Sequence, residues 1–283
     1  MIDQIEIRLL TDADIPVAMR LKELANWNQT TDDWRRLLKL EPEGCFAAVL
    51  EGQVVGTATT TTYGRTLAWI GMVLVDPGFR RLGIATRLMK RAVEYAISRV
   101  DTVKLDATPA GQPVYERLGF RVESRIERWV RDCSHSDTKV EQSKITDAVR
   151  RELLELDRDA FGADRSLLLE SLIDDSSVEP SLVPAADGSV GAYGLVRAGT
   201  RASYCGPAIV SKRSDAEVLL DTVLARLRQG RVYVDLNTES VADSSVLVER
   251  GFNKERDLVR MSYGKASGLT SPNVFAIAGP EVG

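Results

Sequence analysis

The stretch VLVDPGFRRLGIAT at residues 73–86 decides how the first half of this chain is expected to fold. Its apolar start is typical of a strand, an Asp-Pro-Gly turn follows, and the spacing R-x-x-G-x-A then opens a helix. The first amides of a helix have no partner within it, and the helix dipole is positive there, so a diphosphate can bind to them. Gly83 and Ala85 leave that backbone accessible, while Arg80 and Arg81 add positive charge. The stretch therefore predicts an anion-binding strand–turn–helix unit, although small residues at a helix start also occur without any ligand.

The residues around this stretch alternate between helical and strand periodicity. Caps at Thr11 and Thr30, each followed by Asp at the third position, predict two short helices ahead of a β-rich region. The pattern then predicts strands at 46–50, 54–62 and 67–75, an amphipathic helix at 83–98, a strand at 103–107, a helix at 112–118 and closing strands at 122–130. This order is typical of an α/β (α+β) domain with a mixed, mostly antiparallel sheet flanked by helices.

Composition narrows the class of protein. The 283 residues suffice for two domains, and 44% hydrophobic with 28% charged residues is ordinary globular usage. A net charge of −4 argues against nucleic acid or an anionic membrane as a partner. Without a signal peptide or a spanning segment, a cytoplasmic protein is expected. Three cysteines and one histidine, His135, are too few and too scattered for a disulfide framework or a triad, and no metal is expected.

The second half of the chain repeats strings of the first. Gly71–Val75 is echoed by Gly206–Val210, and Glu116–Phe120 by Val248–Phe252. A polar, apolar-poor segment lies between the halves. We therefore predict tandem domains with bounds at 1–131, a linker at 132–144, and 145–283. Within the second half, the pattern predicts helices at 145–160 and 164–173, strands at 189–197 and 201–210, a helix at 215–228, a strand at 231–236 and a helix at 244–250. The apolar tail, residues 273–283, is expected to fold back onto a domain.

A second motif, PVYERLGF at residues 113–120, places a tyrosine four residues before Gly-Phe. Acyl transfer from a thioester to an amine expels a thiolate, and a phenol can protonate that thiolate or hydrogen-bond to it. Tyr115 is therefore the candidate general acid. Alternatively, it is an amphipathic core residue of a short helix.

Together, the two motifs resemble those of the GNAT superfamily of N-acetyltransferases, and the whole chain resembles the two-domain YitH-like group within it. The resemblance implies tandem GNAT folds and an enzyme that transfers an acetyl group from acetyl-coenzyme A (acetyl-CoA) to a primary amine, directly in a ternary complex. The acceptor, a small-molecule or lysine-type amine, and the assembly, monomer or homodimer, stay open. The resemblance also implies that the first domain binds the coenzyme through Val73, Leu74, Val75, Arg80, Arg81, Leu82, Gly83, Ile84, Ala85 and Thr86.

The sequence does not fix a general base. In the family the base is often a carboxylate on the strand before the anion-binding turn, but the corresponding residues here, 67–75, contain none. Asp106, near the end of the next strand, is the tentative candidate, although it is equally suited to cap the loop that follows. The resemblance implies that a main-chain amide near Met72 or Val73 meets the oxyanion.

The segment between the first two helices is a candidate for the acceptor side. The resemblance implies that Trp27, Asn28 and Gln29 line that side and offer an aromatic wall with adjacent amides. The same three residues are as compatible with a packed helix junction.

The second half lacks the features that the first uses to bind the coenzyme. Its turn at residues 211–217 contains no glycine and places Asp215 and Glu217 at the helix start, where they would repel a diphosphate. Leu247 stands where the first half has its tyrosine. The second domain is therefore predicted to be a degenerate GNAT copy. A non-catalytic acyl-CoA sensor or interaction scaffold is the alternative function.

Overall fold

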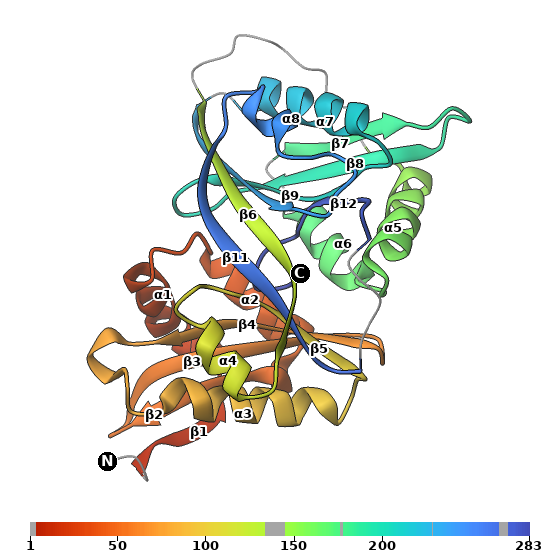
Figure 1. Cartoon of the computed structure of the whole chain (residues 1–283). Coiled ribbons are helices and arrows are strands. Elements are labelled where there is room, and N and C mark those ends of the chain that lie inside the picture. The colour runs from red at the N-terminus through yellow and green to blue at the C-terminus, as the bar shows by residue number, and fades with distance from the viewer. Residues whose placement is uncertain (1–3, 134–144, 176–177, 228, 266–270) are drawn as a thin grey trace. The chain divides into compact units, whose positions relative to one another are not determined.

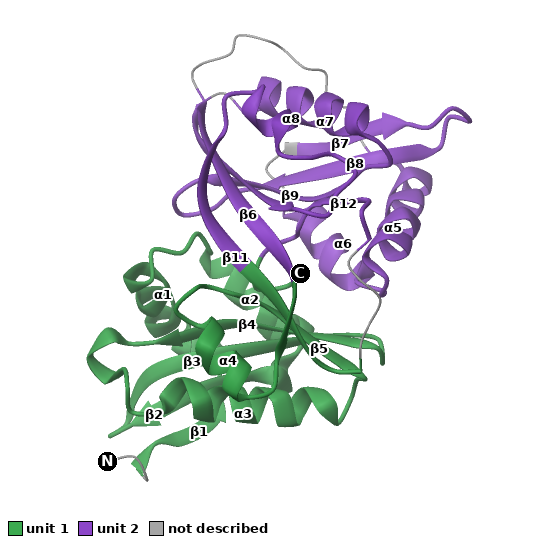
Figure 2. Ribbon diagram, viewed as in Figure 1, with its two compact units in different colours: residues 1–123, 259–267, 280–283 green, residues 124–258, 268–279 purple. Residues whose placement is uncertain are grey.

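The computed structural model describes residues 4–133, 145–175, 178–227, 229–265 and 271–283. The chain forms two compact units (Figure 2): residues 1–123, 259–267 and 280–283 make unit 1, and residues 124–258 and 268–279 make unit 2. Most of the predicted linker, with His135, lies outside the described residues. None of the helices in the described part of the chain combines the length and the apolar composition that crossing a bilayer requires.

Unit 1 contains a six-membered mixed sheet with helices around it (Figure 1). Its strands lie in the order β1-β2-β3-β4-β5-β11, and every neighbouring pair is antiparallel except β4 with β5. This confirms the predicted fold class. The elements are β1 (Glu6–Leu9), α1 (Ile15–Leu24), α2 (Thr31–Leu40), β2 (Cys45–Leu50), β3 (Gln53–Tyr63), β4 (Leu67–Val75), α3 (Ile84–Ile97), β5 (Thr102–Ala107), α4 (Gln112–Arg117) and the end of β11 (Asn253–Gly264).

The predicted caps begin both early helices. The Asp33 amide donates to the Thr30 hydroxyl at 3.2 Å, and the Thr30 amide donates to the Asp33 carboxylate at 2.8 Å, which completes a capping box at the start of α2. At Thr11 a capping box with Asp14 starts a short 3-10 helix, Asp12–Asp14, and the α-helix itself begins only at Ile15.

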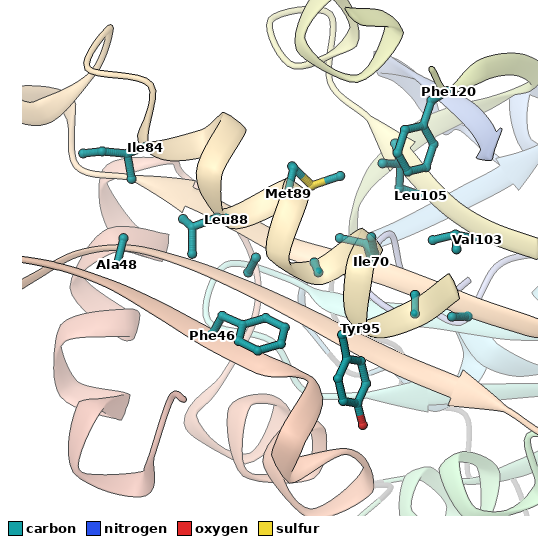
Figure 3. Packing of buried hydrophobic residues seen from close by; sticks show 14 of the residues in the cluster. Phe46, Ala48, Ile70, Ile84, Leu88, Met89, Tyr95, Val103, Leu105 and Phe120 are labelled. Carbon is teal, nitrogen blue, oxygen red and sulfur yellow. The ribbon is translucent and has the colours of Figure 1, made fainter. Parts of the chain in front are cut away.

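The core of unit 1 lies between α3 and the sheet (Figure 3). The predicted stripe of α3, made by Ile84, Leu88, Ala92 and Tyr95, is buried. It packs on sheet residues that include Phe46. Burial of each such side chain contributes about 1.5–3 kcal/mol, so this packing fixes where α3 begins relative to β4.

In its described part, unit 2 contains six strands besides its share of β11, and one of them, β12, lies between β9 and β10. The pairings β7 with β8, β8 with β9, β9 with β12, β12 with β10 and β10 with β6 are antiparallel, and β9 also pairs with β10 in parallel. Strands β7, β11 and β12 were missed by the sequence prediction. The elements are β6 (Arg121–Cys133), α5 (Asp147–Phe161), α6 (Ser166–Asp174), β7 (Val178–Pro184), β8 (Val190–Arg197), β9 (Ser203–Ile209), α7 (Arg213–Arg226), β10 (Gly230–Asn237), α8 (Ser245–Val248), most of β11, and β12 (Val274–Ala276).

The closing strands of the two halves are exchanged between the units. Strand β6 closes the first half of the chain, yet residues 126–133 pair with β10 inside unit 2. Conversely, residues 259–264 of β11 pair with β5 inside unit 1. The tail is divided in the same way, with residues 271–279 in unit 2 and 280–283 in unit 1. Each unit therefore contains chain from both halves.

Removal of residues 273–283 is expected to destabilise the protein, because this tail is packed as predicted. Val274, Phe275 and Ile277 are at most 2% exposed. Loss of one buried Phe side chain typically costs about 3–5 kcal/mol. We expect the melting temperature, measured by calorimetry, to fall by about 10 °C or more. A truncated protein that melts at the temperature of the full chain would contradict this packing.

Candidate functional site

Strands β4 and β5 of unit 1 separate soon after they begin. They pair in parallel over three positions only, Leu67 with Thr102, Ala68 with Val103 and Trp69 with Lys104. Beyond Trp69, in the described part of unit 1, no strand pairs with β4 on its β5 side. The main chain of residues 70–75 therefore borders an opening in the sheet, and residues 73–75 of this segment are the ones predicted to meet the coenzyme.

A β-bulge lies at this opening. The β3–β4 register shifts between Thr57 and Thr59, and Met72 has φ of +50°, a left-handed conformation that is uncommon for a residue with a side chain. The Thr57 hydroxyl donates to the Met72 carbonyl oxygen at 2.8 Å and holds the bulge. The sequence prediction missed this feature, because no glycine or other turn residue occupies position 72.

The turn after β4 leads to an accessible helix start. The Gly78 amide donates to the Asp76 carboxylate at 2.9 Å, and Arg20 lies 2.7 Å from that carboxylate. These contacts, the amide first, hold the pKa of Asp76 below its ordinary value. Arg81 and Gly83 then have positive φ, +65° and +75°, and Gly83 is the N-cap of α3.

Gly83 leaves the helix start open. A Cβ placed on Gly83 would meet no atom within 4 Å, and the residue is exposed. The first intrahelical bond runs from the Arg87 amide to the Gly83 carbonyl oxygen, so the amides before Arg87 lack that kind of partner. The predicted anion cradle is thus an open, glycine-capped start of a fourteen-residue helix.

The predicted coenzyme-binding side chains fall into two groups. Arg80 and Arg81 are exposed, and Arg80 Nε reaches the Val75 carbonyl oxygen at 3.4 Å. The side chains of the other predicted residues are buried or half-buried, so mainly their main-chain groups are available to a coenzyme. Leu74 and Ile84 are buried, and Val73, Val75, Leu82, Ala85 and Thr86 are half-buried.

Tyr115 lies on α4, edge-on to Phe120 with the ring centroids 6.2 Å apart. It packs on the core cluster of unit 1 and is half-buried. A Cβ placed on Gly111 would lie 3.3 Å from its hydroxyl oxygen. Burial raises the pKa of the Tyr115 phenol to about 12, so this group is protonated at neutral pH.

Asp106 is held in an ion pair. Arg260, on β11, donates through Nε and one terminal nitrogen to its two carboxylate oxygens, both at 2.9 Å. Both side chains are buried, and the Arg260 guanidinium also lies over the ring of Trp69. The following loop is capped by Thr108, whose hydroxyl accepts from the Gly111 amide at 3.2 Å. The ion pair of Asp106 therefore joins β5 to β11, the strand that the second half of the chain contributes to unit 1.

The α1–α2 loop contains the predicted acceptor-side residues, and one of them contacts a carboxylate from the C-terminal tail. Trp27 is half-buried, and Asn28 and Gln29 are buried. The Gln29 side-chain amide donates to the Glu281 carboxylate at 2.8 Å. The Gln29 carbonyl oxygen is buried and has no hydrogen-bond partner among the residues that the structure describes. The sequence prediction did not select Glu281, although it expected the tail around it to pack.

Unit 2 differs at each corresponding position. The amides of Ser211 and Lys212 donate to the Asp215 carboxylate at 3.1 and 3.2 Å, so its helix start is capped by its own side chain. Leu247 is buried in the core. Strand β12 lies between β9 and β10, where those strands separate after three parallel pairs. Hydrogen bonds continue on both sides of this strand. The Val210 amide donates to the Asn273 carbonyl oxygen, and the Ile277 amide donates to the Asp235 carbonyl oxygen.

The two units have the fold of acyl-CoA-dependent transferases, and the chain belongs to the GNAT family of acetyltransferases. A model of the acetyltransferase (GNAT) family matches residues 15–120, and a model of an acetyltransferase (GNAT) domain matches residues 153–276. Both halves of the chain therefore contain a region that matches a GNAT model.

Relatives with the same two-domain length are found among curated proteins and solved structures. The chain is 26% identical to the uncharacterized N-acetyltransferase YitH of Bacillus subtilis, over 98% of both chains. It is 25% identical to the holothin acyltransferase of a Pseudoalteromonas species, over 91% of this chain and 87% of that one. A candidate acetyltransferase of Pyrococcus horikoshii has the same fold, with a TM-score of 0.82 at 23% identity over 99% and 96% of the chains.

Proposed function

We propose that this protein transfers an acetyl group from acetyl-CoA to a primary amine, by direct attack within a ternary complex. The observation that carries the proposal is the opening between β4 and β5, which leads to the glycine-capped start of α3. A coenzyme arm can add to the free edge of β4 through main-chain hydrogen bonds, as an extended peptide adds to a sheet edge. The diphosphate then reaches the amides at residues 83–86, beside two exposed arginines.

The chemistry follows from the groups at this opening. The amine nitrogen forms a bond to the thioester carbonyl carbon and gives up one N–H proton to water, while the carbon–sulfur bond breaks and its electron pair leaves on sulfur. A main-chain amide at the Met72 bulge is suited to receive the oxyanion, because the bulge turns that backbone out of the ladder. A thiolate is a much weaker base than a deprotonated amine, so the tetrahedral intermediate expels the thiolate.

Tyr115 assists the departure of the thiolate as a hydrogen-bond donor. Its pKa of about 12 lies well above the roughly 8.5 of an ordinary thiol, so complete proton transfer to the thiolate is uphill by about 5 kcal/mol. A hydrogen bond from the phenol to the developing thiolate carries no such cost and is strong in a buried setting. We therefore assign Tyr115 the role of stabilising the leaving thiolate, with the final proton exchanged with solvent.

Thiol release across an amine panel tests the function. The panel contains ethanolamine, glucosamine, spermidine, a dipeptide with a free N-terminus and a lysine-containing peptide with a blocked one. We expect coenzyme-dependent release of free thiol to rise at least tenfold above hydrolysis with one class of amine, and mass spectrometry to find the acetylated product. Tight coenzyme binding with slow thioester loss for every amine would favour the non-catalytic sensor or scaffold.

Calorimetric titration with coenzyme A is expected to give one binding site per chain. In unit 2 the cradle is capped by Asp215 and the strand opening is filled by β12, so only unit 1 offers both parts of the site. A fitted stoichiometry of two would contradict this assignment of unit 2.

A further inference from the structure

An arginine from the second half of the chain stands where β4 and β5 part. Arg260, on β11, is buried, and its guanidinium donates to both carboxylate oxygens of Asp106 on β5, at 2.9 Å each. The same guanidinium lies over the ring of Trp69 on β4, with its central carbon 4.6 Å from the ring centroid. Trp69 is the last β4 residue that pairs with β5, and Asp106 lies two residues beyond its partner Lys104. One side chain therefore contacts both strands at the start of the opening.

Both contacts hold the guanidinium in place. A bidentate arginine–carboxylate pair sets distance and orientation together, and here neither side chain is more than 1% exposed. The Trp69 ring is itself held, because its indole donates to the Pro280 carbonyl oxygen at 3.1 Å. The main chains of β5 and β11 are paired at the same point, where Arg260 stands opposite Asp106 in register. Arg260 thus links a fixed point on β4 to a fixed point on β5.

The separation of β4 and β5 beyond Trp69 is set by side chains. In the part of unit 1 that the structure describes, no ladder joins the two strands there. A buried ion pair is seldom required for stability alone, because apolar side chains of similar volume often stabilise a fold as well. What the pair adds is a defined geometry, and at this place the geometry decides the width of the opening proposed for the coenzyme arm.

Unit 2 contains an equivalent ion pair without an opening. Arg128 of β6 stands opposite Asp235 of β10 in register and donates to both of its carboxylate oxygens, at 2.7 and 2.5 Å. Its guanidinium lies over the ring of Tyr233, on β10 itself, 4.9 Å from the centroid. As in unit 1, the arginine comes from the other half of the chain. Here, however, β12 lies between β9 and β10, so in the described part of unit 2 the pair borders no such opening.

We propose that Arg260 is a positioning residue of the acetyltransferase site, and that the second half of the chain thereby completes the site of the first. The inference rests on the proposed function. Arg260 acts through β4 and β5: by fixing their separation, it aligns the thioester carbonyl at the Met72 bulge with the phenol of Tyr115, which follows β5 in the chain. A displacement of about 1 Å in such a site can lower the rate about 100-fold. The second half is then required for turnover, although unit 2 offers no coenzyme site of its own.

Arg260→Lys tests this role, because it keeps the positive charge beside Asp106 and removes the planar, bidentate geometry. With acetyl-CoA and the amine of the panel that the wild type uses best, we expect kcat to fall about 100-fold. Affinity for coenzyme A should change less than tenfold, since the helix start proposed to bind the diphosphate is not altered. Arg128→Lys makes the same change in the pair of unit 2 and is the matched control. It should lower the melting temperature by a similar amount and leave kcat within twofold of wild type.

The outcomes separate this inference from the proposed function. An Arg260→Lys variant with kcat within threefold of wild type, or equal losses of kcat in Arg260→Lys and Arg128→Lys, would overturn the positioning role and leave the acetyltransferase activity intact. A wild-type protein that binds coenzyme A but acetylates none of the five amines would overturn the proposed function, and this inference with it.

A second pair of variants applies if Arg260→Lys does not fold. Asp106→Leu with Arg260→Met replaces the ion pair by apolar side chains, and Asp235→Leu with Arg128→Met does the same in unit 2. Only the change in unit 1 should lower kcat, and equal rates in the two double variants would overturn the inference. The loss should also be equal from pH 7 to pH 9.5, because lost alignment, unlike a lost base, is not relieved once the amine is deprotonated in solution. A loss that disappears at pH 9.5 would assign Asp106 the role of base and overturn the positioning role.

Discussion

Gly83→Glu is expected to abolish coenzyme binding. The glutamate carboxylate would project from the N-cap of α3 into the space that the diphosphate needs, and like charges would face each other there. Loss of two or three charge-assisted hydrogen bonds, at about 1.5–3 kcal/mol each, amounts to a weakening of at least about 100-fold. Calorimetric titration with coenzyme A measures the affinity directly, and the thermal shift that coenzyme A gives the wild type should disappear.

Gly52→Glu is the matched control for this variant. Gly52, in the β2–β3 hairpin, has φ of +78° against +75° at Gly83, and a Cβ on either glycine meets no atom within 4 Å. Both variants therefore carry the same backbone strain, about 1 kcal/mol, and the same added charge. Gly52→Glu should bind coenzyme A as the wild type does. Equal affinity in the two variants would mean that the start of α3 does not hold the diphosphate.

Tyr115→Phe is expected to lower kcat about 1,000-fold while the affinity for coenzyme A changes less than threefold. The change removes only the hydroxyl, and the ring keeps its edge-on contact with Phe120. Because the pKa of the Tyr115 phenol is about 12, the wild type should show no alkaline loss of activity from this group below about pH 10.5. Steady-state rates over pH 6–10.5, with saturating amine, measure both effects.

Tyr263→Phe controls for the aromatic cluster around this residue. Tyr263 also contacts Phe120, with ring centroids 5.4 Å apart, and is half-buried like Tyr115. Its variant should retain the wild-type rate within about twofold. If both variants lost activity equally, or if Tyr115→Phe kept full activity, Tyr115 would be a packing residue, the alternative role that its sequence context allows.

Local features of the site could be predicted from the sequence. The open helix start depends on Gly83, on the turn before it and on the amphipathic stripe of α3, and all of these signals lie in one continuous stretch, residues 76–95. Helix caps and strand lengths are decided in the same way, by near neighbours. For this reason the accessible helix start and most elements of unit 1 agree with the prediction, although strand β1 was not predicted.

Other features depend on contacts between distant residues, which a single sequence does not reveal. Asp106 meets Arg260 across 154 positions, and Gln29 meets Glu281 across 252. Local pattern predicts a strand at β6 but not that it pairs in the unit of the other half, and it did not predict β11. The bulge at Met72 gave no signal, because its left-handed conformation is imposed by the β3–β4 register and not by a glycine.

The central claim is that the start of α3 in unit 1 receives the diphosphate of the coenzyme, and a crystal structure with bound coenzyme A tests it most directly. The account predicts diphosphate oxygens within about 3 Å of the amides at residues 83–86, with the coenzyme arm along residues 73–75 in the opening between β4 and β5. Coenzyme bound at the start of α7 in unit 2, or a helix start at Gly83 that stays free of it at saturating concentration, would contradict the claim.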